Sequence, residues 1–497
     1  MSRFQRQSGV YLHPTALPSR HGIGSIGAPA KQFVDAAAEA GQSLWQLCPL
    51  SPVAEVHGFS PYQAYSAFAL EPLLIDLDDL VERGLLDEAD VAPEQSFPED
   101  RVDYDAVAEF KRPLLRSAYE RFDEERPEEI ESAFETFCER VDWLDTYALF
   151  RALKDHFDGV VWTEWPDPVR SREPEALEEY RETLADEVRY RKFLQFLAVD
   201  QWDELHAYAS ERGIDIVGDL PIYVAQDSAD VWANPELFEL DEEGQPALIS
   251  GVPADGNNPP QQWGMPVYDW DAVADADYGW WIDRMDWQLE LSDVVRVDHF
   301  RGFEEYYAIP ADADPGDGSW REGPGLDFFR RIEDALGELP IIAEDIGFVT
   351  EEIDQLRRDI DAPGMKVLQY GDWCTEDHTY LPHTYEEDTV AYPGTHDTNT
   401  VRGWYDNLSD EQRDCLHYYL GADGEEINWE LIDAAWHSDS ILAVVPVQDL
   451  LDLGEWARFN SPGTTDGNWE WRCTPEQLDE LPVGRLRDLT EAAGRQA

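Results

Sequence analysis

Short apolar runs recur along the chain, and segments with helical spacing lie between most of them. Eight of these runs have the length and composition of β-strands. They are residues 9–13, 43–47, 214–218, 293–297, 340–343, 365–370, 389–392 and 441–445. An alanine-rich helix is predicted at residues 30–40, and Gly41 ends it. Strands that alternate with helices favour a parallel sheet, and eight of them favour a closed (β/α)8 TIM barrel of the α/β class.

Two connections between these runs are too long to be simple loops. Residues 70–210 carry apolar positions at three- and four-residue steps, which predicts a mainly helical insertion subdomain after the second strand. The clearest stripes are Phe134, Phe137, Val141, Leu144 and Ala148, followed by Phe193, Phe196, Leu197, Val199, Trp202 and Leu205. Residues 220–283 are rich in Pro, Gly, Asn and Trp and predict an ordered loop region over the barrel mouth. We therefore expect one catalytic barrel domain over residues 1–497, without a separate C-terminal β domain.

The charge of the chain is extreme. It holds 106 acidic and 37 basic residues, which give a net charge of −69. Such a surface repels itself unless salt screens it, so we predict adaptation to molar salt, as in a halophile. It should also avoid nucleic acid and anionic membranes. The hydrophobic fraction of 43% excludes disorder, and the dispersal of the charges disfavours a polyanionic tail or a cation buffer.

The cysteines are few and scattered. They are Cys48, Cys138, Cys374, Cys415 and Cys473, and no two of them form a CxxC motif. Neither a disulfide framework nor a thiolate zinc site is therefore predicted, and a reducing cytoplasm fits best. Because no apolar signal segment or membrane-spanning stretch is recognised, we expect a soluble, cytoplasmic protein, either a monomer or a weak homo-oligomer.

Three apolar runs lead into a carboxylate. Asp298 and Glu344 directly follow two of the predicted strands, and Asp397 lies in a His-Asp pair shortly after a third. The carboxyl ends of the strands are where α/β barrels hold their catalytic groups. We expect the three carboxylates to meet there. Paired carboxylates in that position are typical of glycoside chemistry.

Spacing around these acids predicts their partners. Arg296 precedes Asp298 by two positions, so both face the same side of a strand and the guanidinium can hold the carboxylate ionised. A purely structural ion pair explains that spacing equally well. Glu344 is predicted as the acid partner, with its pKa raised by neighbouring carboxylates, while Asp345 faces away. Asp219 is a further strand-end carboxylate, although Gly-Asp is also ordinary turn chemistry.

Aromatic and imidazole groups complete the candidate site. His396 beside Asp397 is suited to hydrogen-bonding sugar hydroxyls. A structural alternative is an Asp that caps a helix beside a His that packs in the interior. Most tryptophans are expected to fill the core. Trp263 lies among turn residues and is interpreted as a platform on which a sugar ring stacks.

Longer motifs in a fixed order resemble the 4-α-glucanotransferase family, whose members are also called amylomaltases or disproportionating enzymes. The motifs are Gly9–Pro18, Ser60–Ala69, Gly218–Val224, Arg296–Gly302, Ala343–Gly347, Gly394–Asp397, Asn460–Thr464 and Gly467–Trp469. The resemblance implies a TIM-barrel transferase of glycoside hydrolase family 77. Its substrates would be α-1,4-glucans and maltooligosaccharides, and it would need neither a cofactor nor a metal.

The same resemblance implies residue roles. Asp298 matches the family's nucleophile, Glu344 its general acid and base, and Asp397 its transition-state stabiliser. The implied sugar-binding residues are Tyr62, Asp219, Asp255, Gln261, Trp263, Arg296, His299 and His396. One loop departs from the family pattern: residues 256–260 read Gly-Asn-Asn-Pro-Pro where relatives usually show Phe-Ser-Ala-Thr-Gly, and Met265 replaces a usual Asn.

Other functions stay open on the residues alone. A hydrolytic α-amylase-type glycosidase would use the same carboxylates. A metal-dependent barrel hydrolase could use them with His299 and His396 as ligands, although the chain has no HExxH motif. A glucan phosphorylase would need a lysine for pyridoxal phosphate, and none of the five lysines lies in a suggestive motif. A catalytically silent glucan-binding protein would keep the aromatic sites and tolerate loss of Glu344.

Overall fold

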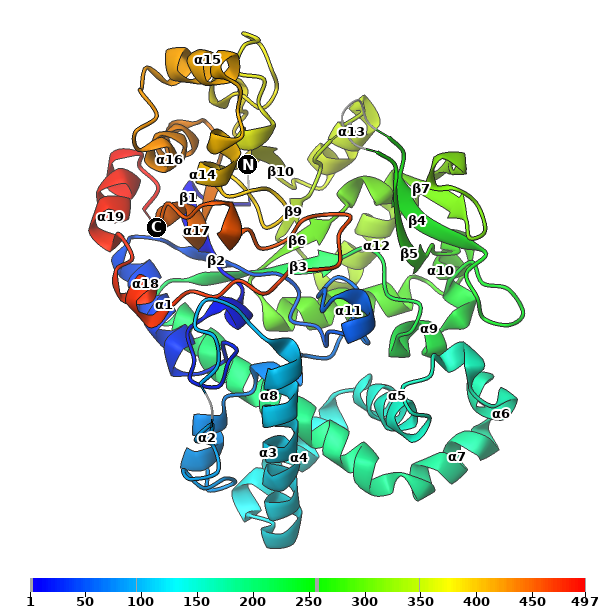
Figure 1. The fold of residues 1–497 in the computed structure, drawn as a ribbon. Helices are drawn as coiled ribbons and strands as arrows, with labels where there is room; N and C mark the ends of the chain where they lie inside the picture. The colour runs from blue at the N-terminus through cyan, green and yellow to red at the C-terminus, as the bar shows by residue number, and fades with distance from the viewer. Residues whose placement is uncertain (1–2, 95, 255–258, 348, 497) are drawn as a thin grey trace.

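A closed barrel of parallel strands forms the centre of the molecule (Figure 1). The computed structural model describes residues 3–94, 96–254, 259–347 and 349–496. Around the barrel the strands follow the order β1, β12, β11, β10, β9, β6, β3 and β2. Their bounds are β1 Gln7–Tyr11, β2 Leu44–Gln46, β3 Asp215–Pro221, β6 Val294–Asp298, β9 Ile341–Ala343, β10 Gly364–Val367, β11 Thr389–Tyr392 and β12 Leu442–Pro446. The prediction of an eight-stranded (β/α)8 barrel is confirmed.

The barrel strands form where the apolar runs are because both of their faces are covered. Every residue of β9, β11 and β12 is buried. Strands enclosed by helices on the outside and side chains on the inside are expected to read as continuous Val, Ile and Ala runs, as these do. The predicted and observed strands agree to within a few residues at each end. The largest extension is in β3, which continues to Pro221 and so includes Asp219 in the strand.

A mainly helical segment connects β2 to β3 and extends below the barrel in Figure 1. Its helices are α2 Leu77–Glu82, α3 Tyr104–Glu125, α4 Glu128–Arg140, α5 Leu144–His156, α6 Asp167–Arg170, α7 Pro174–Thr183 and α8 Ala185–Ser210. The predicted stripes pack against each other: Phe134 meets Phe193 of α8 with ring centres 6.1 Å apart, and it meets Phe196 at 5.7 Å. All of these rings are buried. The stripes are therefore core positions, as their period indicated.

A second, antiparallel sheet lies beside the barrel, in the order β5, β4, β7, β8. Its strands are β4 Leu248–Val252, β5 Gln261–Pro266, β7 Glu305–Pro310 and β8 Ser319–Glu322. The sequence pattern did not predict this sheet. β5 and β8 expose much of their length and carry no continuous apolar run, although β7 contains the buried run Tyr306–Ile309. The sheet matters for the site because β5 carries Trp263.

Other helices cover the outside of the barrel and its two ends (Figure 1). They are α1 Ala28–Glu39, α9 Ala229–Ala233, α10 Trp270–Asp275, α11 Gly279–Leu291, α12 Gly325–Leu336, α13 Glu351–Asp359, α14 Val401–Asp406, α15 Asp410–Leu420, α16 Ile427–His437, α17 Val447–Leu450, α18 Pro475–Asp479 and α19 Val483–Ala492. Within the described residues, no helix combines the length and the apolar character that crossing a bilayer would require.

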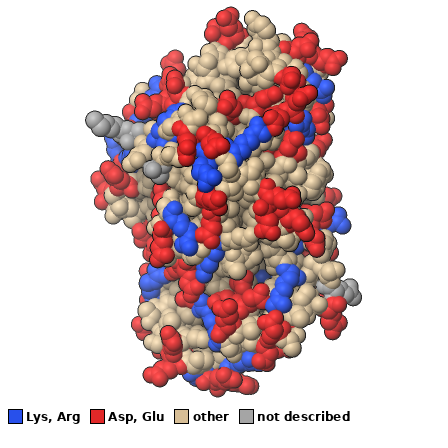
Figure 2. Space-filling model, turned by 90° about the vertical axis from the view of Figure 1, so that its left-hand side faces the viewer, with Lys and Arg blue, Asp and Glu red and all other residues tan. Residues whose placement is uncertain are grey.

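Acidic side chains spread over the whole face drawn in Figure 2. Many of the basic residues are paired with them: Arg83, for example, contacts Asp79, Asp200 and Glu204. On this face the acid excess is thus dispersed, as the sequence indicated.

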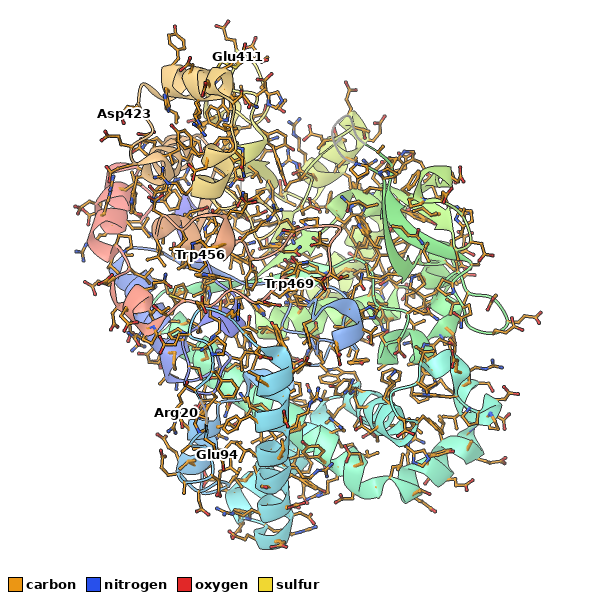
Figure 3. All side chains as sticks on the ribbon, viewed as in Figure 1. Arg20, Glu94, Glu411, Asp423, Trp456 and Trp469 are labelled. Atoms are coloured by element: carbon orange, nitrogen blue, oxygen red, sulfur yellow. A yellow bond between two sulfur atoms is a disulfide. The ribbon has the colours of Figure 1, made fainter. Side chains whose placement is uncertain are left out.

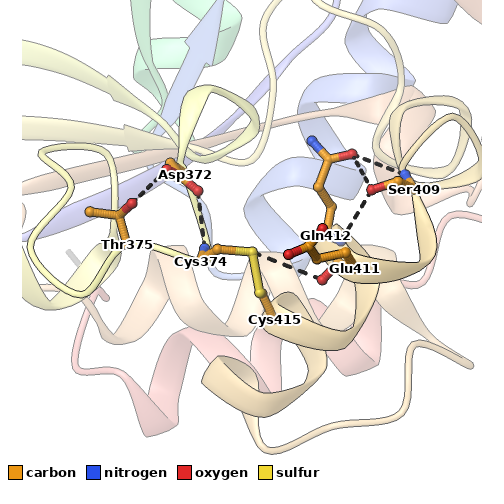
Figure 4. The surroundings of a disulfide bond; sticks show 7 residues. All are labelled: Asp372, Cys374, Thr375, Ser409, Glu411, Gln412 and Cys415. Carbon is orange, nitrogen blue, oxygen red and sulfur yellow. Dashed lines mark hydrogen bonds between the residues drawn. A yellow bond between two sulfur atoms is a disulfide. The ribbon is translucent and has the colours of Figure 1, made fainter.

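One prediction about the cysteines is wrong. Cys374, in the loop after β10, forms a disulfide with Cys415 of α15, with a Cα–Cα distance of 5.1 Å (Figure 4). Asp372 accepts hydrogen bonds from the Cys374 amide and the Thr375 hydroxyl, which orders the loop side of the bridge. The two cysteines are 41 residues apart and belong to no motif. Only the fold brings them together, so cysteine spacing could not reveal the pair.

Candidate active site

Two neighbouring barrel strands bring the first two carboxylates to the same edge. Val297 of β6 pairs with Ala343 of β9, so Asp298 and Glu344 occupy equivalent positions at the ends of adjacent strands. The Glu344 amide donates to the Val297 carbonyl at 3.0 Å, which continues the strand pairing to the edge. The carboxyl ends of these strands form the mouth of the barrel.

Asp298 lies beside a buried guanidinium. Its Oδ1 is 3.0 Å from Arg296 Nη1, and the same nitrogen donates to both oxygens of Asp219 at 2.8 and 2.7 Å. The predicted contact between Arg296 and Asp298 is therefore confirmed. Its electrostatic effect is smaller than expected: burial raises the pKa of Asp298 to about 6, against the opposing pull of Arg296.

Glu344 is held by two backbone amides. Its Oε2 accepts from the His299 amide at 2.7 Å and its Oε1 from the Ile346 amide at 3.3 Å. Burial, followed by the nearby Asp298 carboxylate, raises the pKa of Glu344 to about 8. Asp345 faces away, as predicted, because its carboxylate accepts from the Met365 amide and lies 3.5 Å from Arg357. The pKa of Glu344 is thus raised further than that of Asp298, so Glu344 keeps its proton to a higher pH.

Asp397 has a different environment from the other two acids. Its Oδ1 accepts from Asn460 Nδ2 at 2.6 Å, and its Oδ2 lies 3.3 Å from His396 Nε2. Burial opposes ionisation here, but His396 and Asn460 outweigh it and lower the pKa of Asp397 well below its usual range. The group is a fixed negative charge. His396 itself is buried and stacks on Tyr62, with ring centres 5.5 Å apart.

Tyr62 links two of these groups. Its hydroxyl donates to Asp219 Oδ2 at 2.7 Å and lies 3.0 Å from His396 Nε2. Asp219, Arg296 and Asp298 continue the chain of polar contacts. With Asp397 joined through His396, six residues that the sequence placed in the site are therefore linked in one network of polar contacts between β3, β6, the segment after β11 and the loop of Tyr62.

His299 and Trp263 form the wall on the side of the second sheet. Their rings meet edge to face at 4.8 Å, and the Trp263 indole donates to the Gln261 side chain at 3.1 Å. His299 has a φ of 50°, a left-handed conformation that is uncommon outside glycine and often found at functional sites. This turn directs its amide to Glu344. Asp255, another predicted glucan contact, lies outside the described residues.

Several side chains around the site were not assigned roles from the sequence. Asn460 holds Asp397, and Trp469 packs 5.7 Å from Tyr62 and 6.1 Å from His396. Trp469 is labelled near the centre of Figure 3, where the C-terminal segment crosses the barrel. Both residues belong to motifs that the sequence displays, but neither follows a strand. Tyr380 was missed entirely; its hydroxyl accepts from the Gly347 amide next to the Glu344 segment.

The arrangement can perform acid and nucleophilic chemistry together. The surroundings of Asp298 and Glu344, on adjacent strands, raise the pKa values of the two carboxyl groups by different amounts. Such a difference is the usual basis for assigning one group as the acid and the other as the nucleophile. A third carboxylate is permanently charged. Across the described ranges, no cluster of three or more His, Cys, Asp and Glu side chains has the arrangement of a metal site.

Known proteins resemble this chain over almost its whole length. The family model described as 4-alpha-glucanotransferase matches residues 12–478. The chain belongs to the 4-alpha-glucanotransferase family. It is 45% identical to a 4-alpha-glucanotransferase of Synechocystis sp., over 99% of this chain and 98% of the relative. It is 44% identical to one of Thermus thermophilus, over 99% of each.

A solved member of the 4-alpha-glucanotransferase family shares the fold. The amylomaltase of Streptococcus agalactiae, determined in complex with acarbose, is 38% identical and superposes with a TM-score of 0.95. The match covers 99% of this chain and all of that protein. The resemblance of the motifs to this family is therefore confirmed, and so is the barrel that it implied.

Proposed function

We propose that the protein transfers segments of α-1,4-glucans from a donor to the 4-hydroxyl of a glucan or glucose acceptor. The reaction is a retaining double displacement without a metal or a cofactor. The observation that carries this proposal is the pair formed by Asp298 and Glu344 on adjacent strands, in which the surroundings raise the pKa of Glu344 above that of Asp298. Family membership supports the same activity.

In the first step, Asp298 attacks the anomeric carbon. Its Oδ1 contacts Arg296, so Oδ2 is the oxygen free to form the new bond. The bond between C1 and the glycosidic oxygen breaks, and Glu344 gives its proton to that departing oxygen. A covalent glycosyl-enzyme ester results, with Glu344 left ionised.

In the second step, the 4-hydroxyl of an acceptor attacks C1 and the ester to Asp298 breaks. Glu344, now a base, takes the acceptor's proton. The charge fixed on Asp397 stabilises the positive oxocarbenium character in both steps, and His396 and Tyr62 hold sugar hydroxyls beside it. Two inversions preserve the α configuration.

Transfer competes with hydrolysis for the intermediate. Trp263 and His299 present an aromatic wall next to Glu344, and we assign it, with Gln261 and Asp255, to binding the acceptor glucan and excluding water. A hydrolytic α-amylase-type enzyme is the alternative function, because it would use the same carboxylates. The products distinguish the two.

We further propose that the chain acts as one catalytic unit in concentrated salt, in the cytoplasm. The dispersed acidic surface supports this, since screening over a few ångströms relieves its self-repulsion. The helical insertion at 70–210 and the region at 220–283 then serve as additions to one barrel.

Maltotriose as the only substrate tests the activity. Incubation across a series from 0.1 to 3 M KCl should give glucose and a ladder of longer maltooligosaccharides, with the highest rate at molar salt. Chromatography of the products measures both. Complete conversion to glucose and maltose without elongation would show a hydrolase, and a chelator that abolished the ladder would show a metal enzyme. A rate that falls steadily with salt would contradict the proposed salt adaptation.

A further inference from the structure

A cavity of about 340 Å³ lies away from the catalytic carboxylates. It is lined by the segment around Phe68, by the end of α4 and start of α5, by α9 and by α11. Its volume falls in the range of small-molecule pockets, about 300–1,000 Å³. None of the residues assigned to the active site lines it. The function described so far leaves this cavity unused.

The floor of the cavity is aromatic and fixed in place. Trp143 and Trp287 meet edge to face at 5.3 Å, and Phe68 contacts Trp143 at 6.2 Å and Trp280 at 5.8 Å. The Trp287 indole donates to the Phe68 carbonyl at 2.7 Å, which ties α11 to the segment of Phe68. Trp143 and Trp280 are only partly buried, so the rings form an accessible surface.

The rim of the cavity is polar. Arg140 pairs with Glu290 at 2.6 Å, and the carboxylates of Asp142, Asp283 and Asp286 stand on the same rim.

We propose that this cavity is a second saccharide-binding site, which takes one or two glucose units of an α-1,4-glucan. Flat rings below and hydrogen-bonding groups around the edge match the apolar faces and the hydroxyl edges of a sugar. Anions are disfavoured because the rim carries more carboxylates than guanidinium groups. An organic cation is disfavoured because the Arg140 guanidinium already lies 5.9 Å from the Trp287 ring.

The segment that lines the cavity, Ser66–Phe68, closely follows Tyr62 of the active site in the sequence. Ser66 and Phe68 line both this cavity and a smaller one that includes Tyr62 and Asp219. The same segment is anchored by the Ala67 amide, which donates to Asp230 at 2.8 Å. The choice of a glucan as ligand rests on the proposed function.

Calorimetric titration with maltotriose tests the proposal. The parent for this experiment is Asp298→Asn, which prevents turnover during the titration. We expect two binding sites per chain, of which Trp143→Ala removes one and Trp143→Phe retains it with about five- to tenfold weaker affinity. Tyr418→Ala is the matched control, since Tyr418 is a 91% exposed aromatic residue on α15. It should leave both sites intact.

A second variant covers the case in which Trp143→Ala does not fold. Asp286 is exposed at the rim, so Asp286→Ala should fold normally and weaken the same site several-fold. A single site in the parent, or two unchanged sites in both folded variants, would overturn the proposal. Binding of choline at the second site with no maltotriose binding there would also overturn it. These outcomes do not depend on transfer: two sites without a product ladder would reject the proposed function and keep the saccharide site.

Discussion

Acidic residues at the barrel mouth and on the outer surface are the same chemical groups in opposite surroundings. At the mouth, burial raises the pKa values of Asp298 and Glu344 although a guanidinium lies nearby. On the surface, Asp277 accepts two hydrogen bonds from Arg331, and its pKa is lowered. Loss of water therefore outweighs ion pairing at Asp298 and Glu344, whereas pairing with Arg331 outweighs it at Asp277. The predictions below test this difference from its strongest consequence to its weakest.

Removal of the nucleophile should have the largest effect. Asp298→Asn keeps the shape and the contact with Arg296 but cannot form the ester, so the initial rate of maltotriose disproportionation should fall by at least about 10³-fold. The control is Asp312→Asn, which changes an exposed acid on the surface and should leave the rate unchanged. Turnover of Asp298→Asn within tenfold of the parent would exclude this residue as the nucleophile.

The ionisation of Asp298 and Glu344 should be visible in the pH profile of kcat/KM. Activity requires Asp298 ionised and Glu344 protonated, so kcat/KM should fall below a pH of about 6 and above a pH of about 8. Glu344→Gln should lower the rate by about 10²–10⁴-fold and abolish the alkaline limb. A donor with a fluoride leaving group needs no acid in the first step, and glycosyl-enzyme formation from it should be largely retained. An unchanged alkaline limb in the variant would assign that titration to another group.

Loss of the hydrogen bond that Asn460 donates to Asp397 should lower activity by less, but measurably. Asn460→Ala removes a hydrogen bond of 2.6 Å to a charged oxygen, worth about 1.5–3 kcal/mol. We therefore expect kcat/KM to fall by about 10- to 100-fold. Asn407→Ala is the matched control, because Asn407 makes the same amide-to-carboxylate contact with exposed Glu455 at 3.4 Å. Equal effects in the two variants would show that Asn460 contributes nothing specific to Asp397.

The sequence predicts most of the barrel and its carboxylates for a simple physical reason. Barrel strands are buried on both faces, so their apolar runs stand out even in a very acidic chain, and the residues that follow those runs lie at the mouth. Asp298, Glu344 and Arg296 are found in this way. Their relative pKa values are harder to predict, because burial exceeded the pull of Arg296 only in the folded site.

Contacts between residues that are far apart in the sequence cannot be predicted from local patterns in this way. Asn460 reaches Asp397 across 63 residues, and Cys374 reaches Cys415 through the packing of a loop on α15. Two strands of the second sheet, β5 and β8, are largely exposed and lack an apolar run, and the buried run of β7 was not recognised as a strand. The contacts of Asn460 and Cys374 depend on tertiary packing that leaves no local period in the sequence.

The weakest effect is expected from a surface acid in a well-formed ion pair. Asp277 has a φ of 55°, which asparagine also tolerates, so Asp277→Asn removes the charge without straining the backbone. Because exposed pairs contribute little and salt screens them, Tm should change by at most about 2 °C in dilute buffer and not at all in 2 M KCl. Thermal unfolding followed by circular dichroism measures both, with activity unchanged throughout. A large loss of Tm in molar salt would show that surface carboxylates stabilise this protein through specific pairs, and would remove the contrast with the barrel mouth.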